Sequence, residues 1–139
     1  MTNIQPRFLD LIGKFKSVLM CLSVDGYSTT NDYIRSGSNW SIVDKHIRDY
    51  ATSDVVGNLL FSPVVQIYNI LTITDLIDYA EQLQKETGRR TDISFLLNNY
   101  PKCLDIRNLP QHIRDVAVEK LETWSATSTY FAEDERNKQ

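Results

Sequence analysis

Helical and strand-like patterns alternate along almost the whole chain, and this alternation constrains the fold more than any other feature of the sequence. The predicted strands are residues 17–22, 61–68 and 92–97, and helical patterns precede, separate and follow them. In such an order each helix carries the chain between neighbouring parallel strands, through right-handed crossovers. The sequence therefore predicts an α/β fold built on a parallel sheet.

The first half of the chain carries two predicted helices and a short helical turn. The first helix covers residues 6–15, with Pro6 near its start, and the helical turn covers residues 30–35. Ser38 or Asn39 is a good cap for the second helix. The apolar face predicted for that helix contains Ile42, Val43, His46, Ile47 and Tyr50.

Two further helices are predicted in the second half. Thr74 is expected to cap the third helix, and Gly88 is expected to end it in the left-handed conformation that glycine adopts easily. Pro110 is expected in the first turn of the last helix. The apolar positions of that helix are Ile113, Val116, Ala117, Val118 and Leu121.

Composition excludes several classes of protein. The chain has 139 residues, a net charge of −3 and 42% hydrophobic residues, which is typical of one soluble globular domain. The chain has no excess of Lys and Arg over Asp and Glu, which argues against a nucleic-acid partner. No apolar stretch is long enough to span a membrane, and no signal peptide is visible. Together with only two cysteines, these features favour a cytoplasmic protein.

The first predicted strand ends in a polar segment that is a candidate binding site. The apolar run at 17–22 leads directly into Ser23-Val24-Asp25-Gly26, and Arg35 follows twelve residues after Ser23. Ligands of parallel α/β folds bind at the carboxyl ends of the strands, where polar loops converge. An arginine and a serine placed there predict a pocket for a small anionic ligand. The simpler interpretations are that Asp25 only closes a D-G turn and that Arg35 pairs with Asp32 or Asp44 at the surface.

The segment around this strand resembles the middle of radical S-adenosylmethionine (SAM) enzymes, most closely those with a small "twitch" region. Three of their elements occur in order: Ser23 to Gly26 at a strand end, Tyr33-Ile34-Arg35, and Asn39-Trp40 opening a helix. Looser likenesses are Thr2-Asn3, the strand Val64 to Asn69, and the run from Ile106 to Pro110. The resemblance covers residues 2–124.

The resemblance implies a fold and a function. Radical SAM enzymes have a partial (β/α)6 barrel, so residues 1–124 would form the C-terminal part of such a core, and the missing N-terminal half would be its partner. The chain would contribute strand ends that bind SAM and substrate for 5′-deoxyadenosyl radical chemistry. In related enzymes, a serine and an arginine at the spacing of Ser23 and Arg35 contact SAM. Asp25 is a further candidate for SAM binding, and Asn69 and Asn99 are candidates for an approach to the adenosine.

The sequence also departs from the family. Radical SAM chemistry needs a [4Fe–4S] cluster on three closely spaced cysteines. Cys21 and Cys103 lie far apart, neither belongs to a CxxC or CxxxC motif, and the family's G-G-E-P element is missing. Cys21 falls inside an apolar strand and is expected to be a buried hydrophobe. His46 and His112 have no metal-ligand spacing, so the sequence predicts neither a metal site nor a catalytic residue in this chain.

Three interpretations remain open from the sequence. The chain is a fragment of a radical SAM enzyme that is inactive alone; or a standalone, non-catalytic α/β binding or interaction domain; or an unrelated α/β domain whose Ser23 and Arg35 bind another anion. Only three strands are predicted, which would leave both edges of the sheet unpaired unless another segment covers them. Residues 125–139 are polar and charged and are expected to form a disordered tail.

Overall fold

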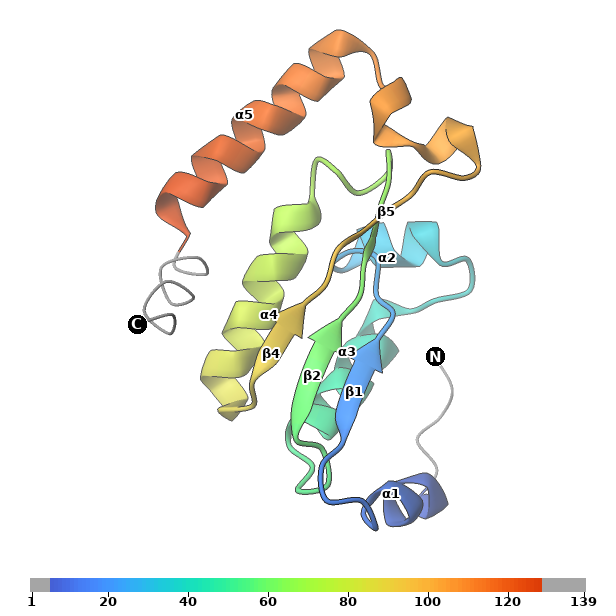
Figure 1. Cartoon of the computed structure of the whole chain (residues 1–139), viewed down its shortest axis with the longest axis vertical. Helices are drawn as coiled ribbons and strands as arrows, with labels where there is room; N and C mark the ends of the chain where they lie inside the picture. Colours follow the sequence, from blue (N-terminus) through green and yellow to red (C-terminus); the bar gives the residue numbers. More distant parts are fainter. Residues whose placement is uncertain (1–5, 129–139) are drawn as a thin grey trace.

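The chain folds around a small parallel sheet. A computed structural model describes residues 6–128 of the protein. Three strands, β1 (Leu19–Leu22), β2 (Asn58–Phe61) and β4 (Thr91–Ile93), form a parallel sheet in the order β1-β2-β4 (Figure 1). The predicted α/β class and the parallel sheet are therefore confirmed.

Two of the predicted strands are each divided into two pieces. The chain continues from β2 into β3 (Val64–Val65) and from β4 into β5 (Leu96–Leu97), and these short strands pair in parallel with each other. The strand predicted at 61–68 begins earlier, at Asn58. It is interrupted before Val64 because Pro63 has no N–H to give to the ladder.

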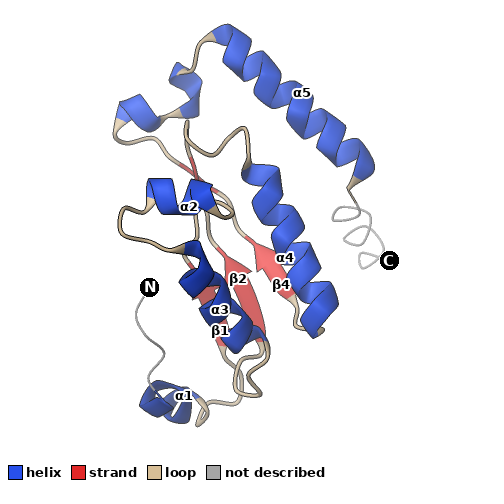
Figure 2. Ribbon diagram, turned by 180° about the vertical axis from the view of Figure 1, so that it is seen from behind, coloured by secondary structure: helices blue, strands red, loops and turns tan. Residues whose placement is uncertain are grey.

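Both long crossover helices cover the same face of the sheet. Figure 2 shows α3 (Trp40–Ala51) and α4 (Ile73–Thr87) in front of the strands, on the side opposite to that seen in Figure 1. Apolar side chains from both helices and from the facing side of the strands form the core beneath them. Its fully buried members include Ile47, Leu59, Phe61, Leu76 and Leu83.

The predicted apolar face of α3 is correct except for one residue. Val43, His46, Ile47 and Tyr50 are buried, whereas Ile42 is 53% exposed. The buried residues recur at intervals of three and four, so they form one stripe, and Ile42 lies just outside that stripe. The Asn39 side chain accepts a hydrogen bond from the Ser41 N–H and caps the helix as predicted.

The boundaries of α4 agree with the sequence at one end only. Gly88 ends the helix with a φ of 69°, in the left-handed region that favours glycine. The start is two residues earlier than predicted. Thr72 occupies the cap position and Thr74 lies in the first turn, because Ile73 already packs into the core and begins the helix.

The last helix, α5 (Gln111–Thr127), follows Pro110 and lies against α4. The Trp124 indole N–H donates a hydrogen bond to Asp78, with a distance of 2.7 Å between the two heavy atoms. Of the apolar positions predicted here, Ala117 is buried and Leu121 partly buried. Val116 and Val118 are exposed, so the helix has a narrow contact stripe. The helix continues past Trp124 into the predicted tail, and residues 129–139 lie outside the described part of the chain.

Short helices complete the described part of the chain. They are α1 (Pro6–Ile12), α2 (Thr29–Ile34), and the 3₁₀ turns η1 (Lys102–Leu104) and η2 (Ile106–Asn108). Of these, α2 replaces the predicted turn at 30–35 almost residue for residue. None of the helices between residues 6 and 128 is long and apolar enough to cross a membrane.

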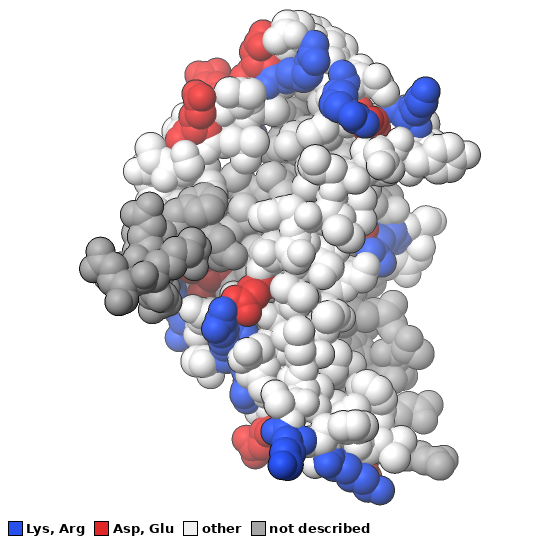
Figure 3. Space-filling model, viewed as in Figure 1, with Lys and Arg blue, Asp and Glu red and all other residues white. Residues whose placement is uncertain are grey.

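Within residues 6–128, no long helix covers the second face of the sheet. Leu19 and Cys21 on β1 are exposed on this side, so the prediction that Cys21 is a buried hydrophobe is wrong. The cause is the strand's alternation, which turns Met20 and Leu22 towards the helices and Cys21 away from them. Figure 3 shows that the middle of this face is largely uncharged, with Lys, Arg, Asp and Glu mainly around its periphery.

The one-sided core predicts very different effects for two isoleucines on α3. Ile47→Ala removes a fully buried side chain and should lower the free energy of unfolding by about 2–5 kcal/mol. Ile42→Ala truncates a half-exposed side chain and should change it by less than about 1 kcal/mol. Urea denaturation followed by circular dichroism measures both, and equal effects would contradict the assigned helix face.

Candidate functional site

A buried carboxylate organises the carboxyl end of the sheet. The Asp25 side chain, just beyond β1, is only 7% exposed. Its Oδ1 accepts the Val64 N–H at the start of β3, at 2.9 Å, and its Oδ2 accepts the Arg35 Nε–H, at 2.8 Å. Asp25 therefore does more than close the D-G turn: it ties the end of β1 to the neighbouring strand and to Arg35.

Arg35 connects this carboxylate to the predicted serine. Its Nη2 donates to the Ser23 hydroxyl oxygen, at 2.7 Å. The pairing with Asp32 or Asp44 that the sequence left open is not present, since Asp32 accepts the Trp40 N–H and Asp44 is paired with Arg48. The structure thus brings three of the predicted site residues into one hydrogen-bonded group.

Arg35 also keeps binding capacity of its own. Its side chain is 40% exposed, and its Nη1 makes no hydrogen bond to any residue in the described range 6–128. The guanidinium is therefore held by two of its nitrogens while part of its planar fork still faces solvent. Such a group can bind a carboxylate or another oxyanion without first having to be ordered.

Two buried asparagines fix the backbone beneath this group. The Asn31 Oδ1 accepts the Asp25 N–H, at 3.3 Å. The Asn69 amide donates to the Asp25 carbonyl, at 2.6 Å, and to the Val64 carbonyl, at 2.9 Å, while its oxygen accepts the Gln66 N–H. Asn69 is completely buried and its amide is used by the backbone, so in this structure it positions the site.

The remaining predicted residue, Asn99, is not part of this hydrogen-bonded group. Asn99 is exposed and follows β5, in the loop that leads to Pro101. It shares the carboxyl end of the sheet with Asp25 but takes no part in the hydrogen bonds that join Ser23, Asp25 and Arg35.

Register places two further serines in line with Ser23. Leu22 pairs with Phe61, and Phe61 pairs with Ile93, so the residues that follow them, Ser23, Ser62 and Ser94, stand side by side at successive strand ends. Each follows a residue that packs towards the helices, so each faces the uncovered side of the sheet. The sequence contained the serines but not the register, and this row was therefore missed.

The cluster-binding chemistry of the resembled family does not fit the described residues. Cys21 lies on β1 and Cys103 in η1, and neither has a second cysteine near it in the sequence. Within residues 6–128 no group of three or more His, Cys, Asp or Glu side chains is arranged to hold a metal ion. The thiolates of this chain alone do not make a [4Fe–4S] site.

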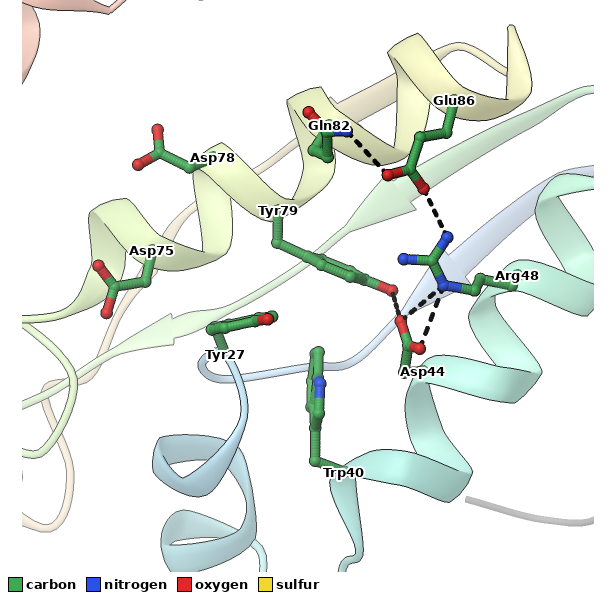
Figure 4. A pocket seen from close by; sticks show the side chains of 9 residues that line it. All are labelled: Tyr27, Trp40, Asp44, Arg48, Asp75, Asp78, Tyr79, Gln82 and Glu86. Carbon is green, nitrogen blue, oxygen red and sulfur yellow. Dashed lines mark hydrogen bonds and ion pairs between the residues drawn. The ribbon is translucent and has the colours of Figure 1, made fainter.

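A separate hollow of about 540 Å³ lies between α3 and α4 (Figure 4). Three aromatic rings line it, those of Tyr27, Trp40 and Tyr79, with centroids 5.2–5.4 Å apart. The remaining lining residues are Asp44, Arg48, Asp75, Asp78, Gln82 and Glu86.

Its polar groups are mostly bonded to one another. The Tyr79 hydroxyl donates to Asp44, which accepts from Arg48, and Arg48 donates to Glu86. Hydrogen bonding to Arg48 lowers the pKa of Glu86, while burial and the Asp44 hydrogen bond raise the pKa of Tyr79. This chain of contacts joins α3 to α4 across the hollow.

The Asp25 contacts predict a sharp difference between two neighbouring substitutions. Asp25→Ala leaves the Val64 N–H and the Arg35 guanidinium without their partner and should lower the free energy of unfolding by about 2–4 kcal/mol. Ser23→Ala removes one exposed hydroxyl and should cost less than about 1 kcal/mol. Thermal and urea unfolding measure both, and a harmless Asp25→Ala would show that the site does not depend on this carboxylate.

The raised pKa of Tyr79 predicts loss of stability in alkaline solution. In the unfolded chain the hydroxyl ionises near its ordinary pKa of 10.0, whereas in the folded protein burial keeps it protonated to higher pH. Above about pH 10 the unfolded state therefore binds fewer protons than the folded state, and the free energy of unfolding falls as the pH rises.

Tyr79→Phe should make this alkaline fall less steep, although it removes the hydrogen bond to Asp44 at neutral pH. Tyr100→Phe is the matched control, because Tyr100 is 83% exposed and should leave the slope unchanged. Urea unfolding between pH 8 and pH 11 gives the slopes. Identical slopes for the wild type and Tyr79→Phe would show that Tyr79 is not the source of the alkaline loss of stability.

Comparison with known proteins identifies no relative. No family model matches the chain, and no curated protein or solved structure matches it.

Proposed function

We propose that this chain supplies SAM-binding strand ends to a radical SAM enzyme and is not catalytic alone. The observation that carries the proposal is the group Ser23–Asp25–Arg35 at the carboxyl end of a parallel sheet. The likeness of residues 2–124 to radical SAM enzymes assigns SAM contacts to Ser23 and Arg35. The hydrogen bond between these two side chains supports a joint role.

The chemistry of the two side chains suits the amino acid end of SAM. The exposed part of the Arg35 guanidinium would hold the carboxylate, since a planar fork matches its two oxygens. The Ser23 hydroxyl accepts from Arg35 and still has its own proton to donate to the same ligand. Asp25 would position Arg35 and would not contact the ligand, because both of its oxygens already accept hydrogen bonds from the protein.

The layer arrangement supports a place in a partial (β/α)6 barrel. The strands are parallel, and both long crossover helices lie on one face, as in the wall of a barrel. The outer strands of the three-stranded sheet, β1 and β4, each pair on one side only within the described residues. We infer that further strands, from an N-terminal half outside this chain, would continue the sheet and cover its second face.

The iron–sulfur cluster would then be held by that other half. Its ligands are not found in this chain, where Cys21 and Cys103 lie on separate elements. The residues of this chain would bind and orient the cofactor at the strand ends. Isolated, the chain is expected to bind SAM weakly and to convert no substrate.

Ligand binding to the chain tests the proposal. Isothermal titration calorimetry with S-adenosylhomocysteine should give saturable binding, and Arg35→Ala should weaken it about tenfold or more. Arg35→Lys keeps the charge but loses the planar fork, and should weaken binding by an intermediate factor. Arg90→Ala is the control, because Arg90 is an exposed residue just before β4 that pairs with Asp92.

Two outcomes would count against the proposal. Equal binding by the wild type and both Arg35 variants would remove this residue from the site. Binding of acetate or sulfate at Arg35 without binding of S-adenosylhomocysteine would favour an unrelated anion-binding domain in place of a SAM site.

A further inference from the structure

Gln66 is a nearly buried residue whose side-chain amide has no partner among the described residues. The residue follows β3 and is only 6% exposed. Its side-chain amide makes no hydrogen bond to any residue between 6 and 128, although its backbone N–H and carbonyl are both bonded to the Asn69 turn. The amide atoms themselves still reach the surface. An amide held in place at the surface with no protein partner is free to bind water or a ligand.

The backbone sets the direction in which Gln66 points. The N–H groups of Val64 and Gln66 both bond towards the β1 side, to Asp25 and Asn69, while Val65 lies between them. This is the alternation of an extended strand, in which residues two apart share a face. Phe61 packs towards the helices, and the carbonyls of Phe61, Pro63 and Val65 all accept hydrogen bonds from the β4–β5 segment. The backbone therefore alternates without a break, and Gln66 shares the face opposite to Phe61 with Ser62 and Val64.

Gln66 therefore stands on the same face and at the same end of the sheet as the Arg35 group. Ser23 and Ser62 are neighbours across the pairing of β1 with β2, about 4.8 Å apart. Gln66 lies four residues beyond Ser62, roughly 13 Å along the strand direction. A ligand anchored by an anionic end at Arg35 would need an extended shape to reach it, with Val64 lying between as apolar surface.

We propose that Gln66 is a specificity-determining residue that binds the adenine edge of the ligand anchored at Arg35; this inference rests on the proposed SAM site. A carboxamide presents a donor beside an acceptor, and adenine presents the complementary pair, its exocyclic amine and an adjacent ring nitrogen. Val64, half-buried on the same face, would contact the flat ring.

The two asparagines that the sequence suggested for the adenosine are less suitable. Both donors and the oxygen of the Asn69 amide are taken by the backbone. Asn99 is exposed in the loop beyond β5. Gln66 differs from Asn69 in that its amide is unpaired among the described residues, and from Asn99 in that the residue is only 6% exposed.

A double-mutant cycle between protein and ligand tests this assignment. The probes are S-adenosylhomocysteine and its 6-deamino analogue, in which hydrogen replaces the exocyclic amine of the purine. The proteins are the wild type, Gln66→Leu and the control Gln111→Leu, which changes an exposed glutamine at the start of α5. Titration calorimetry gives the ratio of the two affinities for each protein.

The wild type and Gln111→Leu should both prefer the adenosyl compound by about tenfold, and Gln66→Leu should lose most of this preference. A preference that survives in Gln66→Leu, with binding still dependent on Arg35, would overturn the role of Gln66 and leave the proposed function intact. If the wild type does not bind S-adenosylhomocysteine, or binds it no more tightly than Arg35→Ala does, the SAM site itself is overturned and this inference with it.

The NMR signal of the Gln66 side-chain amide provides a second readout that does not need the variant to fold. It should shift when S-adenosylhomocysteine is added and should shift less with the 6-deamino analogue. A signal that stays in place at saturating ligand would place the adenine elsewhere.

Discussion

The structure depends above all on how the chain buries the carboxylate of Asp25. A charged group loses its hydration when it is buried and is tolerated only where hydrogen bonds and an opposite charge replace the water. Here the Val64 N–H and the Arg35 guanidinium do so, and they come from different segments of the chain. The carboxylate can be satisfied only if β1, β3 and the end of α2 meet at one point. Asn31 and Asn69 bind the N–H and the carbonyl of Asp25 itself, so this end of the sheet is rigid.

That rigidity decides which groups are left for a ligand. Both oxygens of Asp25 and the whole amide of Asn69 are used within the protein. Ser23, part of Arg35 and the amide of Gln66 retain capacity, and all three lie on the uncovered side of the sheet or at its rim. A site whose polar groups are fixed before binding loses little conformational entropy when a ligand arrives. The polar chain through Arg48 is different, because its members satisfy one another and tie two helices together.

The sequence predicts the fold class and the first half of the site because both depend on local patterns. Alternating helices and strands indicate a parallel sheet, Gly88 marks a helix end, and the spacing from Ser23 to Arg35 brings both side chains to one strand end. Features that depend on register were not accessible in this way. The row with Ser62 and the burial of Gln66 follow from which residues face each other across strands, and no local pattern encodes that pairing.

The exposed face of the sheet is the feature least expected of a parallel fold, because parallel sheets are normally covered on both sides. β1 shows the asymmetry: Leu22 packs under the helices, while Leu19 and Cys21 are exposed on the other side. Apolar residues on both faces of one strand are costly in water on the uncovered side, and they are typical of strands that are covered twice. The polar residues on that face gather at the carboxyl end, where Ser23 and Arg35 meet. An apolar lower part and a polar end are what the barrel that we propose would require of β1, since the lower layers of a barrel interior are packed and the strand ends bind ligand.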